Sequence, residues 1–264
     1  MIHEKLKQVH LDGVLKYKLP VKLFDYLKNY MGDSPDDFSD KEPIHMGKHL
    51  AGNINDEYLL HNIDSKMYAD IVKFYTNIAR EYHDTYELQS DIFSTWDNAN
   101  YIRADRNKFS ENMYNFDKSG HVNTLYMESF WGNYQKKYEF NPPHQHSGVY
   151  SFVLFVKIPY DLEKEMEYFP RTNSPFGDYK GVNSCFTFRY NMPFSGKITD
   201  LPIRITKDYE GTGFFFPSYA THGVNPFYTS DDYRITISGN LCVKKCLMGR
   251  EEESLVPPKR TWKQ

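Results

Sequence analysis

Six short runs of aromatic and β-branched residues dominate the second half of the chain. They cover residues 124–131, 149–158, 184–190, 202–206, 213–216 and 233–238, and Gly, Pro, Asn and Asp separate them. Residues of these types fit the pleated, half-buried surface of a sheet, and the separators are the residues that turns require. The runs therefore predict β-strands, and six strands in close succession predict a β-sandwich or barrel.

The first half of the chain shows helical spacing in two places. One stretch has apolar residues at helical intervals between a proline and a glycine: Pro20, Phe24, Leu27, Met31 and Gly32. In the other, apolar residues recur at intervals of three and four: Met67, Ile71, Phe74, Tyr75, Ile78 and Tyr82. We expect a short helix near 20–31, an exposed loop over the turn-rich residues 32–42, and a longer helix from Ser65 that lies against a sheet.

The order of these elements, helices first and strands second, indicates an α+β protein with the helices on one face of the β-structure. We expect one domain over residues 1–264. Its parts would be a mainly helical and loop region over 1–121, a β-rich core over 122–240, and a partly loose tail over 241–264. We find no internal repeat.

Composition narrows the range of partners. Aromatic residues make up 17% of the chain, far more than a disordered chain carries, so most of the sequence should be packed. The formal net charge of -3 argues against nucleic-acid and anionic-membrane partners. No uncharged stretch is long enough to cross a bilayer, and three cysteines match neither a disulfide framework nor a zinc ribbon.

Three histidines have the spacing and surroundings of a metal site. His144 and His146 follow a Pro-Pro pair, and residues i and i+2 of an extended segment point to the same side. His222 comes from a distant strand-like region. Neutral imidazole suits iron, copper, zinc and nickel, and three protein ligands with open positions are typical of non-haem Fe(II) oxygenases. The alternative is a set of hydrogen-bonded structural histidines. It is the weaker explanation, because all three histidines lie at the edges of strand-like runs.

An arginine and a threonine follow the last of these histidines. Arg234 lies 234 − 222 = 12 residues after His222, and Thr236 shares its strand face. A planar guanidinium beside a hydroxyl can hold a carboxylate by paired hydrogen bonds. The alternative is an ordinary barrel arginine in a salt bridge. Beside a metal site, a bound dicarboxylic cosubstrate is the better explanation.

With these residues the chain resembles the 2-oxoglutarate- and Fe(II)-dependent oxygenases, especially a prolyl-hydroxylase-like branch frequent in marine phage genomes. The segments that carry the resemblance are residues 131–148, 151–159, 213–224 and 234–240. The resemblance implies a double-stranded β-helix (jelly-roll) fold and a single catalytic domain. Its cofactors would be Fe(II) and 2-oxoglutarate, the latter as cosubstrate.

The resemblance also implies roles for individual residues. His144 and His222 would ligate iron, and Arg234 with Thr236 would take the distal carboxylate of 2-oxoglutarate. Tyr134 or Asn133 on the preceding strand would help to hold it. The reaction would hydroxylate a C–H bond with dioxygen while 2-oxoglutarate becomes succinate and carbon dioxide. The substrate would be a protein or peptide side chain such as proline, with a free amino acid, another small metabolite or a nucleobase as alternatives.

The chain departs from the family pattern at one ligand. The family has His-x-Asp/Glu where this sequence has His146 in the carboxylate position. We favour a metal site of His144, His146 and His222. Other readings are a carboxylate from the long connection 160–181, His146 as a contact outside the metal's ligand set, or a missing carboxylate that makes room for a halide. The candidate carboxylates are Asp161, Glu163, Glu165, Glu167 and Asp178. The connection itself reads equally well as a lid or as a surface insertion.

Two rival functions fit parts of the pattern. A cupin-type metal dioxygenase acting without 2-oxoglutarate would explain the His-x-His, but the glutamate expected a few residues after His146 is absent. A non-catalytic jelly-roll binding protein with a structural metal would use four protein ligands rather than three. The N-terminal residues lack the apolar run of a signal peptide, so we expect a cytoplasmic protein, in the host cytoplasm if it is phage-encoded.

Overall fold

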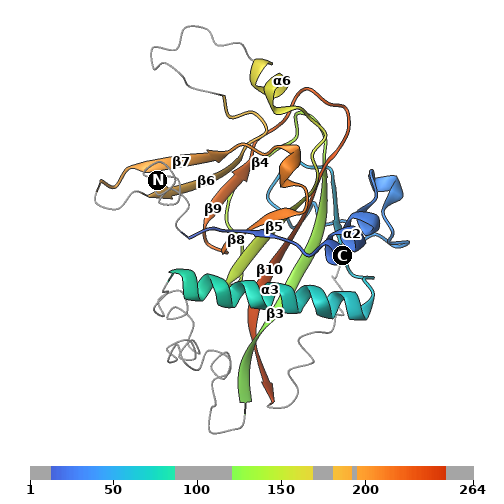
Figure 1. The fold of residues 1–264 in the computed structure, drawn as a ribbon, viewed down its shortest axis with the longest axis vertical. Coiled ribbons are helices and arrows are strands. Elements are labelled where there is room, and N and C mark those ends of the chain that lie inside the picture. The colour runs from blue at the N-terminus through green and yellow to red at the C-terminus, as the bar shows by residue number, and fades with distance from the viewer. Residues whose placement is uncertain (1–12, 87–120, 169–180, 192–194, 248–264) are drawn as a thin grey trace.

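The computed structural model describes residues 13–86, 121–168, 181–191 and 195–247 (Figure 1). Its α-helices are α2 (Val21–Met31), α3 (Ser65–Tyr86) and α6 (Leu162–Glu167). Its strands are β1 (Leu15–Lys18), β2 (Asp56–Leu59), β3 (His121–Gln135), β4 (Asn141–His144), β5 (Tyr150–Lys157), β6 (Phe186–Asn191), β7 (Ile198–Ile203), β8 (Thr212–Pro217), β9 (Thr221–Val224) and β10 (Arg234–Leu247).

The strands form two antiparallel sheets. The larger sheet has the order β1-β8-β5-β10-β3-β2, and the smaller has the order β4-β9-β6-β7. From β3 to β10 the chain passes back and forth between the sheets, so that β3, β5, β8 and β10 belong to one and β4, β6, β7 and β9 to the other (Figure 1). This strand order is that of a double-stranded β-helix, and the predicted fold class is confirmed.

The alternation of side chains along β5 explains why the larger sheet has a core on each face. Val153 and Phe155 join Phe186 of the smaller sheet in the core between the sheets. Phe152 and Leu154 join the core on the opposite face, against the helices. Successive side chains of a strand point to opposite faces, so a strand buried on both sides needs an unbroken apolar run. Burying each of these phenylalanines contributes about 2–3 kcal/mol.

Helices α2 and α3 cover the outer face of the larger sheet, as the sequence predicted (Figure 1). Leu27 and Ile71 are completely buried, and the Tyr75 ring stacks on Phe152 with centroids 3.6 Å apart. Asp64 starts α3, because its side chain accepts hydrogen bonds from the backbone N–H groups of residues 66 and 67. Gly32 ends α2 with φ +68, a conformation that side chains disfavour.

The structure corrects several details of the predicted boundaries. The N-terminal part is not only helix and loop, because β1 and β2 extend the larger sheet at its two edges. Strand β10 continues to Leu247, so the segment after residue 240 is not a tail from that point on. The strand expected at 202–206 is β7 at Ile198–Ile203. Residues 248–264 and most of the connection 160–181 lie outside the described residues.

The region 32–42 is less exposed than its composition suggested. Asp40 is buried, where it accepts a hydrogen bond from Asn62 and lies 3.0 Å from the His61 ring. Phe38 packs between Tyr30 and Tyr58. A polar, turn-rich sequence therefore forms an ordered cover over the end of α2, because its two inward side chains find partners there.

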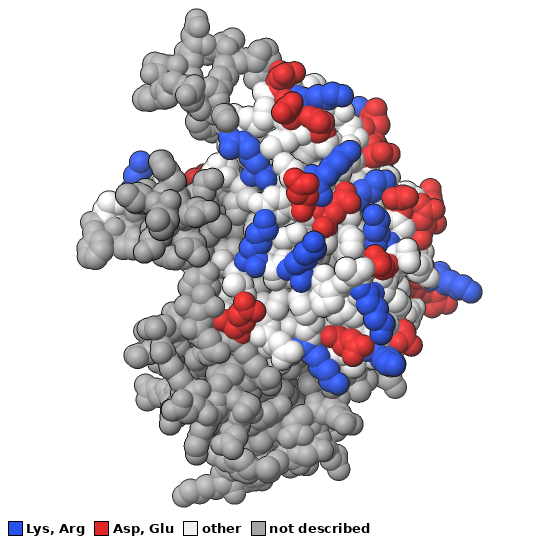
Figure 2. All heavy atoms as spheres, viewed as in Figure 1, with Lys and Arg blue, Asp and Glu red and all other residues white. Residues whose placement is uncertain are grey.

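Charged side chains of both signs are interspersed on the face shown in Figure 2. The described residues of that face form no single-sign patch of the kind that binds a polyanion. Among the described residues no helix has the length and apolar content that crossing a membrane requires.

Candidate metal centre and its two cavities

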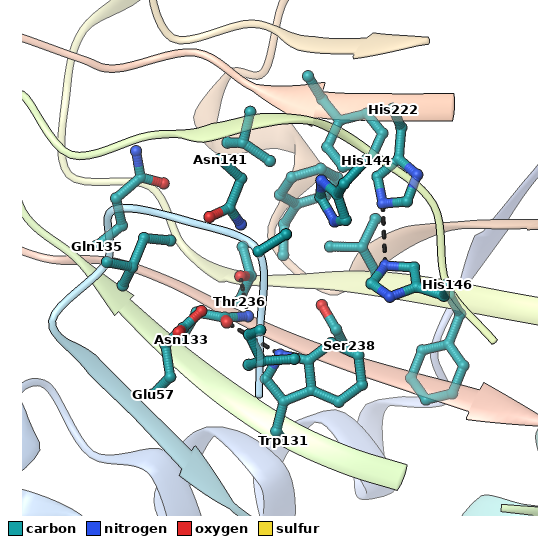
Figure 3. A pocket seen from close by; sticks show the side chains of 18 of the residues that line it. Glu57, Trp131, Asn133, Gln135, Asn141, His144, His146, His222, Thr236 and Ser238 are labelled. Atoms are coloured by element: carbon teal, nitrogen blue, oxygen red, sulfur yellow. Dashed lines mark hydrogen bonds between the residues drawn. The ribbon is translucent and has the colours of Figure 1, made fainter. Parts of the chain in front are cut away.

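The three predicted histidines meet where the smaller sheet faces the space between the sheets. His144 is the last residue of β4 and pairs directly with His222 on β9. His146 follows in the turn that leads to β5, where its backbone N–H donates to the carbonyl of Ser218. The hydrogen bonding of β4, β9 and this turn therefore fixes all three Cα positions (Figure 3).

Their ring nitrogens are spaced as ligands of a single ion would be. One ligand atom from each histidine can be chosen so that all lie within 4.8 Å of one another. The Nε2 atoms of His146 and His222 are 3.2 Å apart. Two nitrogens that are each about 2.1 Å from one ion lie about 3.0–3.4 Å from each other at octahedral or tetrahedral angles. This pair fits a divalent metal without rearrangement.

Backbone carbonyls determine which nitrogen two of the rings offer. The Nδ1 of His144 lies 2.8 Å from the carbonyl of Pro142, and the Nδ1 of His222 lies 2.9 Å from that of Ala220. A carbonyl only accepts, so each Nδ1 carries the proton and each Nε2 keeps a lone pair. This arrangement prepares both residues to coordinate a metal through Nε2.

Burial keeps the three imidazoles neutral. Desolvation lowers the pKa of His146 to about 4, and the nearby His144 adds to the effect. Desolvation, followed by its two histidine neighbours, holds the pKa of His222 well below its ordinary value. Desolvation also lowers the pKa of His144. Neutral imidazole is the form that binds metal, so protons do not compete at neutral pH.

Aromatic rings hold the imidazoles in place. Phe186 stacks on His222 at an interplanar angle of 12°, and Phe216 meets the same ring edge-on with centroids 4.7 Å apart. Trp131 approaches His146 at 5.7 Å. With only 4% of its surface exposed, His222 is enclosed by apolar groups that exclude water from one side of the cluster.

An inner cavity extends from the histidines into the space between the sheets (Figure 3). Its polar lining residues other than the histidines are Glu57, Asn133, Gln135, Asn141, Thr236 and Ser238, with Trp131 beside them. The Trp131 indole N–H donates to the Asn133 side-chain oxygen at 3.1 Å, and the Asn133 amide donates to the Thr236 hydroxyl at 3.0 Å. The hydrogen of the Thr236 hydroxyl is thereby left to donate to another group.

An outer cavity of about 320 Å³ adjoins the inner one at the histidines. Its walls include residues 49–51, Glu128, Ser129 and Asn240, and it shares His144, His146 and Trp131 with the inner cavity. Gln145 and Ser147 on its rim are exposed, so it opens to solvent. The histidine cluster therefore borders both cavities, which also share Leu50 and the exposed Ala51.

Arg234 does not line the inner cavity. Its Nε and one Nη donate to the Gln135 side-chain oxygen, and its other N–H groups donate to the Tyr160 hydroxyl and to the carbonyls of Ser184 and Asn225. All five guanidinium donors thus have acceptors within the protein, and 1% of the residue is exposed. In this arrangement Arg234 reaches the cavity only through Gln135, contrary to the direct contact that the sequence suggested.

The two candidates on β3 fall on opposite sides of the strand. Asn133 points into the inner cavity, where it meets Thr236 (Figure 3). Tyr134 points to the helical side, where its hydroxyl donates to the carbonyl of Met31. Tyr134 therefore cannot contact a ligand in the cavity, as the alternation of side chains along a strand requires.

The connection after β5 offers no carboxylate to the cluster within its described part. Asp161 caps α6, and Glu165 is buried where it accepts hydrogen bonds from the backbone N–H groups of Tyr228 and Thr229. Glu163 and Glu167 lie on α6, away from the metal-binding cluster found among the described residues. Asp178 lies outside the described residues.

Several residues of the inner cavity escaped sequence analysis. Ser238 could have been found, because it continues the i+2 spacing of Arg234 and Thr236. Asn141 directly precedes the Pro-Pro-His segment. Glu57 had no signal, because nothing in a four-residue strand of mixed polarity shows which partner it will face.

Residues 129–240 match the family model described as "Putative 2OG-Fe(II) oxygenase". The matched segment contains all three histidines, Arg234 and Thr236, and the six complete strands from β4 to β9, with part of β3 and part of β10 on either side. Together with the strand order, this match makes the chain similar to the 2-oxoglutarate- and Fe(II)-dependent oxygenases over residues 129–240. The cofactors that this similarity indicates are Fe(II) and 2-oxoglutarate.

Similar solved structures include a prolyl-4-hydroxylase from Pseudomonas putida, at 11% identity and a TM-score of 0.42, covering 88% of this chain and 94% of that one. A Trichoplax adhaerens prolyl hydroxylase with a hypoxia-inducible-factor peptide has 10% identity and a TM-score of 0.39, covering 97% and 91%. HygX from Streptomyces hygroscopicus, with nickel, 2-oxoglutarate and hygromycin B bound, has 10% sequence identity and a TM-score of 0.37. The match covers 92% of this chain and 87% of that one. Likenesses this low carry no argument about activity. No curated protein matches the chain.

Proposed function

We propose that His144, His146 and His222 hold the iron of this oxygenase, and that it hydroxylates a side chain of a peptide or protein, with proline as the leading candidate. The observation that carries the proposal is the convergence of three neutral imidazoles at the border of two cavities. Three protein ligands would leave open coordination positions on a bound metal for a chelating cosubstrate and dioxygen.

The inner cavity suits the cosubstrate. Its polar lining combines the carboxyl group of Glu57 with neutral hydrogen-bonding groups, and the Trp131–Asn133–Thr236 chain leaves a hydroxyl donor for a carboxylate oxygen. Gln135 is held by Arg234 on one side and donates to the carbonyl of Glu139 on the other, so its position is fixed. A cosubstrate bound here would be oriented before dioxygen arrives.

When bound, iron and 2-oxoglutarate allow one oxygen atom of dioxygen to enter succinate, with loss of carbon dioxide, and the other to enter the substrate C–H bond. The residues of the chain orient the reactants and exclude water. Phe186 and Phe216 shield His222 from solvent, and Trp131 lies between the two cavities. The protein thereby limits which C–H bond can approach the cluster.

The outer cavity supports a chain-like substrate. Its rim residues His49, Gln145 and Ser147 are exposed, so a molecule bound there can continue beyond the cavity. Amide and hydroxyl groups on its wall, such as Asn240 and Ser129, can bond a peptide backbone. A closed pocket would instead favour a small metabolite.

The test is anaerobic reconstitution with Fe(II) and 2-oxoglutarate. We expect the weak visible charge-transfer band of the chelate, and succinate once oxygen is admitted. His222→Ala should abolish both, whereas His45→Ala, at an exposed histidine outside both cavities, should change neither. Oxygen consumption without succinate would instead favour a cupin-type dioxygenase.

The unusual ligand has a test of its own. His146→Asp places an anionic side chain where the family has one and lowers the charge of the metal centre by one unit. We expect Fe(II) to bind with altered affinity, measured by competition with a chelating dye. An unchanged affinity would remove His146 from the ligand set.

A further inference from the structure

A row of polar side chains crosses the inner face of the larger sheet beside the outer cavity. Asn240 on β10 pairs with Ser129 on β3 and with Ser151 on β5, so the three side chains lie next to one another. Asn240 is only 7% exposed and Ser151 only 1%. In the neighbouring row the same face holds the apolar residues Trp131 and Val153. The inner faces of two packed sheets are ordinarily apolar, so the polar row is a feature that packing alone does not require.

Hydrogen bonds connect this row in one direction. The Ser151 hydroxyl donates to the Asn240 side-chain oxygen at 2.8 Å, and the Asn240 amide donates to the Ser129 hydroxyl at 2.9 Å. A hydroxyl has one hydrogen and a side-chain amide nitrogen has two. The hydrogen of the Ser129 hydroxyl and the second N–H of Asn240 therefore have no acceptor within the described part of the chain.

Both donors lie on the wall of the outer cavity. A β-bulge shapes this part of the wall: Asn240 pairs with Ser129, whereas Leu241 pairs with Met127, so Glu128 is an extra residue of β3. The bulge interrupts the alternation of side chains along the strand, and the adjacent residues Glu128 and Ser129 line the same cavity. Bulges are over-represented next to active sites, where they re-aim side chains.

The two donors are held close to the metal-binding histidines. Trp131, whose ring lies 5.7 Å from that of His146, is two residues from Ser129, which is roughly 7 Å along an extended strand. Ser218 connects the polar row to the same histidine, because its hydroxyl contacts Ser151 and its carbonyl accepts from the backbone N–H of His146. A peptide group bound by the donors would therefore lie within about two residues of the histidines.

We propose that the Ser129 hydroxyl and the Asn240 amide bind a backbone carbonyl oxygen of the peptide substrate, next to the residue that is hydroxylated. This rests on the proposed function, which takes the occupant of the outer cavity to be a peptide. A carbonyl oxygen has two lone pairs and can accept from both groups. It is also neutral, which suits a cavity whose described lining includes the acid Glu128 and neither lysine nor arginine. A free carboxylate, the other possible acceptor, would be repelled by that acid.

The test measures peptide binding by calorimetric titration of the protein loaded with Fe(II) and 2-oxoglutarate in the absence of oxygen. The first probe is the peptide acetyl-Ala-Ala-Pro-Ala-Ala-amide. Two further probes replace one carbonyl oxygen by sulfur, at the proline or at the residue before it. Sulfur accepts hydrogen bonds more weakly than oxygen, so one of these two thioamides should bind the wild type about five- to tenfold more weakly than the first probe.

Ser129→Ala is the matched variant. It should bind the first probe about five- to tenfold more weakly than the wild type does, and the difference among the three probes should shrink to about twofold, because the contact that distinguishes them is lost. Ser129→Thr retains a hydroxyl and should restore the difference. Ser195→Ala removes an exposed hydroxyl on the connection between β6 and β7 and should behave as the wild type does. The wild-type comparison of the three probes decides the question by itself if Ser129→Ala does not fold.

A further pair of probes separates a carbonyl from a carboxylate as the acceptor. Acetyl-Ala-Ala-Pro-amide ends in a neutral amide, and acetyl-Ala-Ala-Pro with a free carboxyl end carries a negative charge instead. The amide should bind more tightly, because Glu128 lines the same cavity. Tighter binding of the free acid would show that the two donors hold a carboxylate, and it would overturn the proposal.

The remaining outcomes separate this proposal from the proposed function. Equal binding of the two thioamides and the first probe by the wild type, or an unchanged affinity in Ser129→Ala, overturns the role of Ser129 and Asn240 and leaves the proposed function standing. A loaded wild type that binds none of the peptides overturns the peptide substrate, and this proposal with it. Failure of the protein to bind Fe(II) and 2-oxoglutarate overturns the proposed iron site itself.

Discussion

Two buried polar clusters in this protein have opposite hydrogen-bonding states. Around Arg234 each of the five donors has an acceptor, and the acceptors come from four separate parts of the chain. Among the histidines, the Nε2 atoms of His146 and His222 lie 3.2 Å apart and can share a single hydrogen bond, and no carboxylate belongs to this metal-binding cluster in the described part of the chain. A satisfied cluster holds the protein together, whereas an unsatisfied one is prepared for a ligand.

The largest effect should follow from removing the satisfied cluster. Arg234→Ala would leave the oxygen of Gln135 and the carbonyls of Ser184 and Asn225 without donors in a buried site. We expect the free energy of unfolding to fall by about 3–5 kcal/mol, measured by urea denaturation of the apo protein. Arg189→Ala, which removes an exposed pair with Asp200, should cost less than about 1 kcal/mol.

The comparison would fail if Arg234→Ala left stability nearly unchanged while 2-oxoglutarate binding was lost. Arg234 would then be a ligand-binding residue, as the sequence suggested. The carboxylate of the cosubstrate would replace some of the hydrogen-bond acceptors that Arg234 has within the protein.

The unsatisfied cluster should respond in metal affinity more than in stability. His222→Ala removes one nitrogen ligand and should weaken Co(II) binding, followed by its visible spectrum, about 100-fold or more. His45→Ala serves as the control, because this histidine is exposed and remote from the cluster. Equal metal affinity in wild type and His222→Ala would show that the metal binds elsewhere.

The same cluster should make the apo protein sensitive to acid. The pKa of His146 is about 4 in the folded protein and about 6.5 when unfolded, so the unfolded chain takes up the proton first as pH falls. The contribution of His146 to stability is complete above about pH 6.5 and should decrease by about 3 kcal/mol by pH 4. Thermal unfolding of wild type and His146→Gln across this range measures the effect, and equal slopes in the two proteins would contradict it.

The smallest effect contrasts the two faces of the strands that flank the cavity. Thr236→Val removes the hydroxyl donor and should weaken 2-oxoglutarate binding about tenfold. Tyr134→Phe, whose hydroxyl contacts only the helical side, should leave that affinity unchanged and cost about 1 kcal/mol of stability. Calorimetric titration of both variants tests the contrast, which would fail if the Tyr134 variant lost affinity instead.

The sequence predicted the elements that carry their own signal. The aromatic runs at β5 and β8 bury both faces of a strand and can hardly form anything else, and helical spacing identified α2 and α3. The short strands β2, β4 and β9 had no such signal, because four residues of mixed polarity become a strand only by pairing with a neighbour. Those short strands carry Glu57, His144 and His222.

Residue types and spacing alone were enough to single out His144, His146 and His222. The His-x-His after two prolines and the distal histidine beside a strand-like run are both features of the local sequence. The environment of each side chain was decided by the tertiary structure. Pairing of β3 with β10 and of β2 with β3 brought Gln135 to Arg234 and Glu57 to the cavity, across separations of about a hundred and about eighty residues. Charge, desolvation and hydrogen-bond satisfaction depend on such neighbours, and a linear pattern does not contain them.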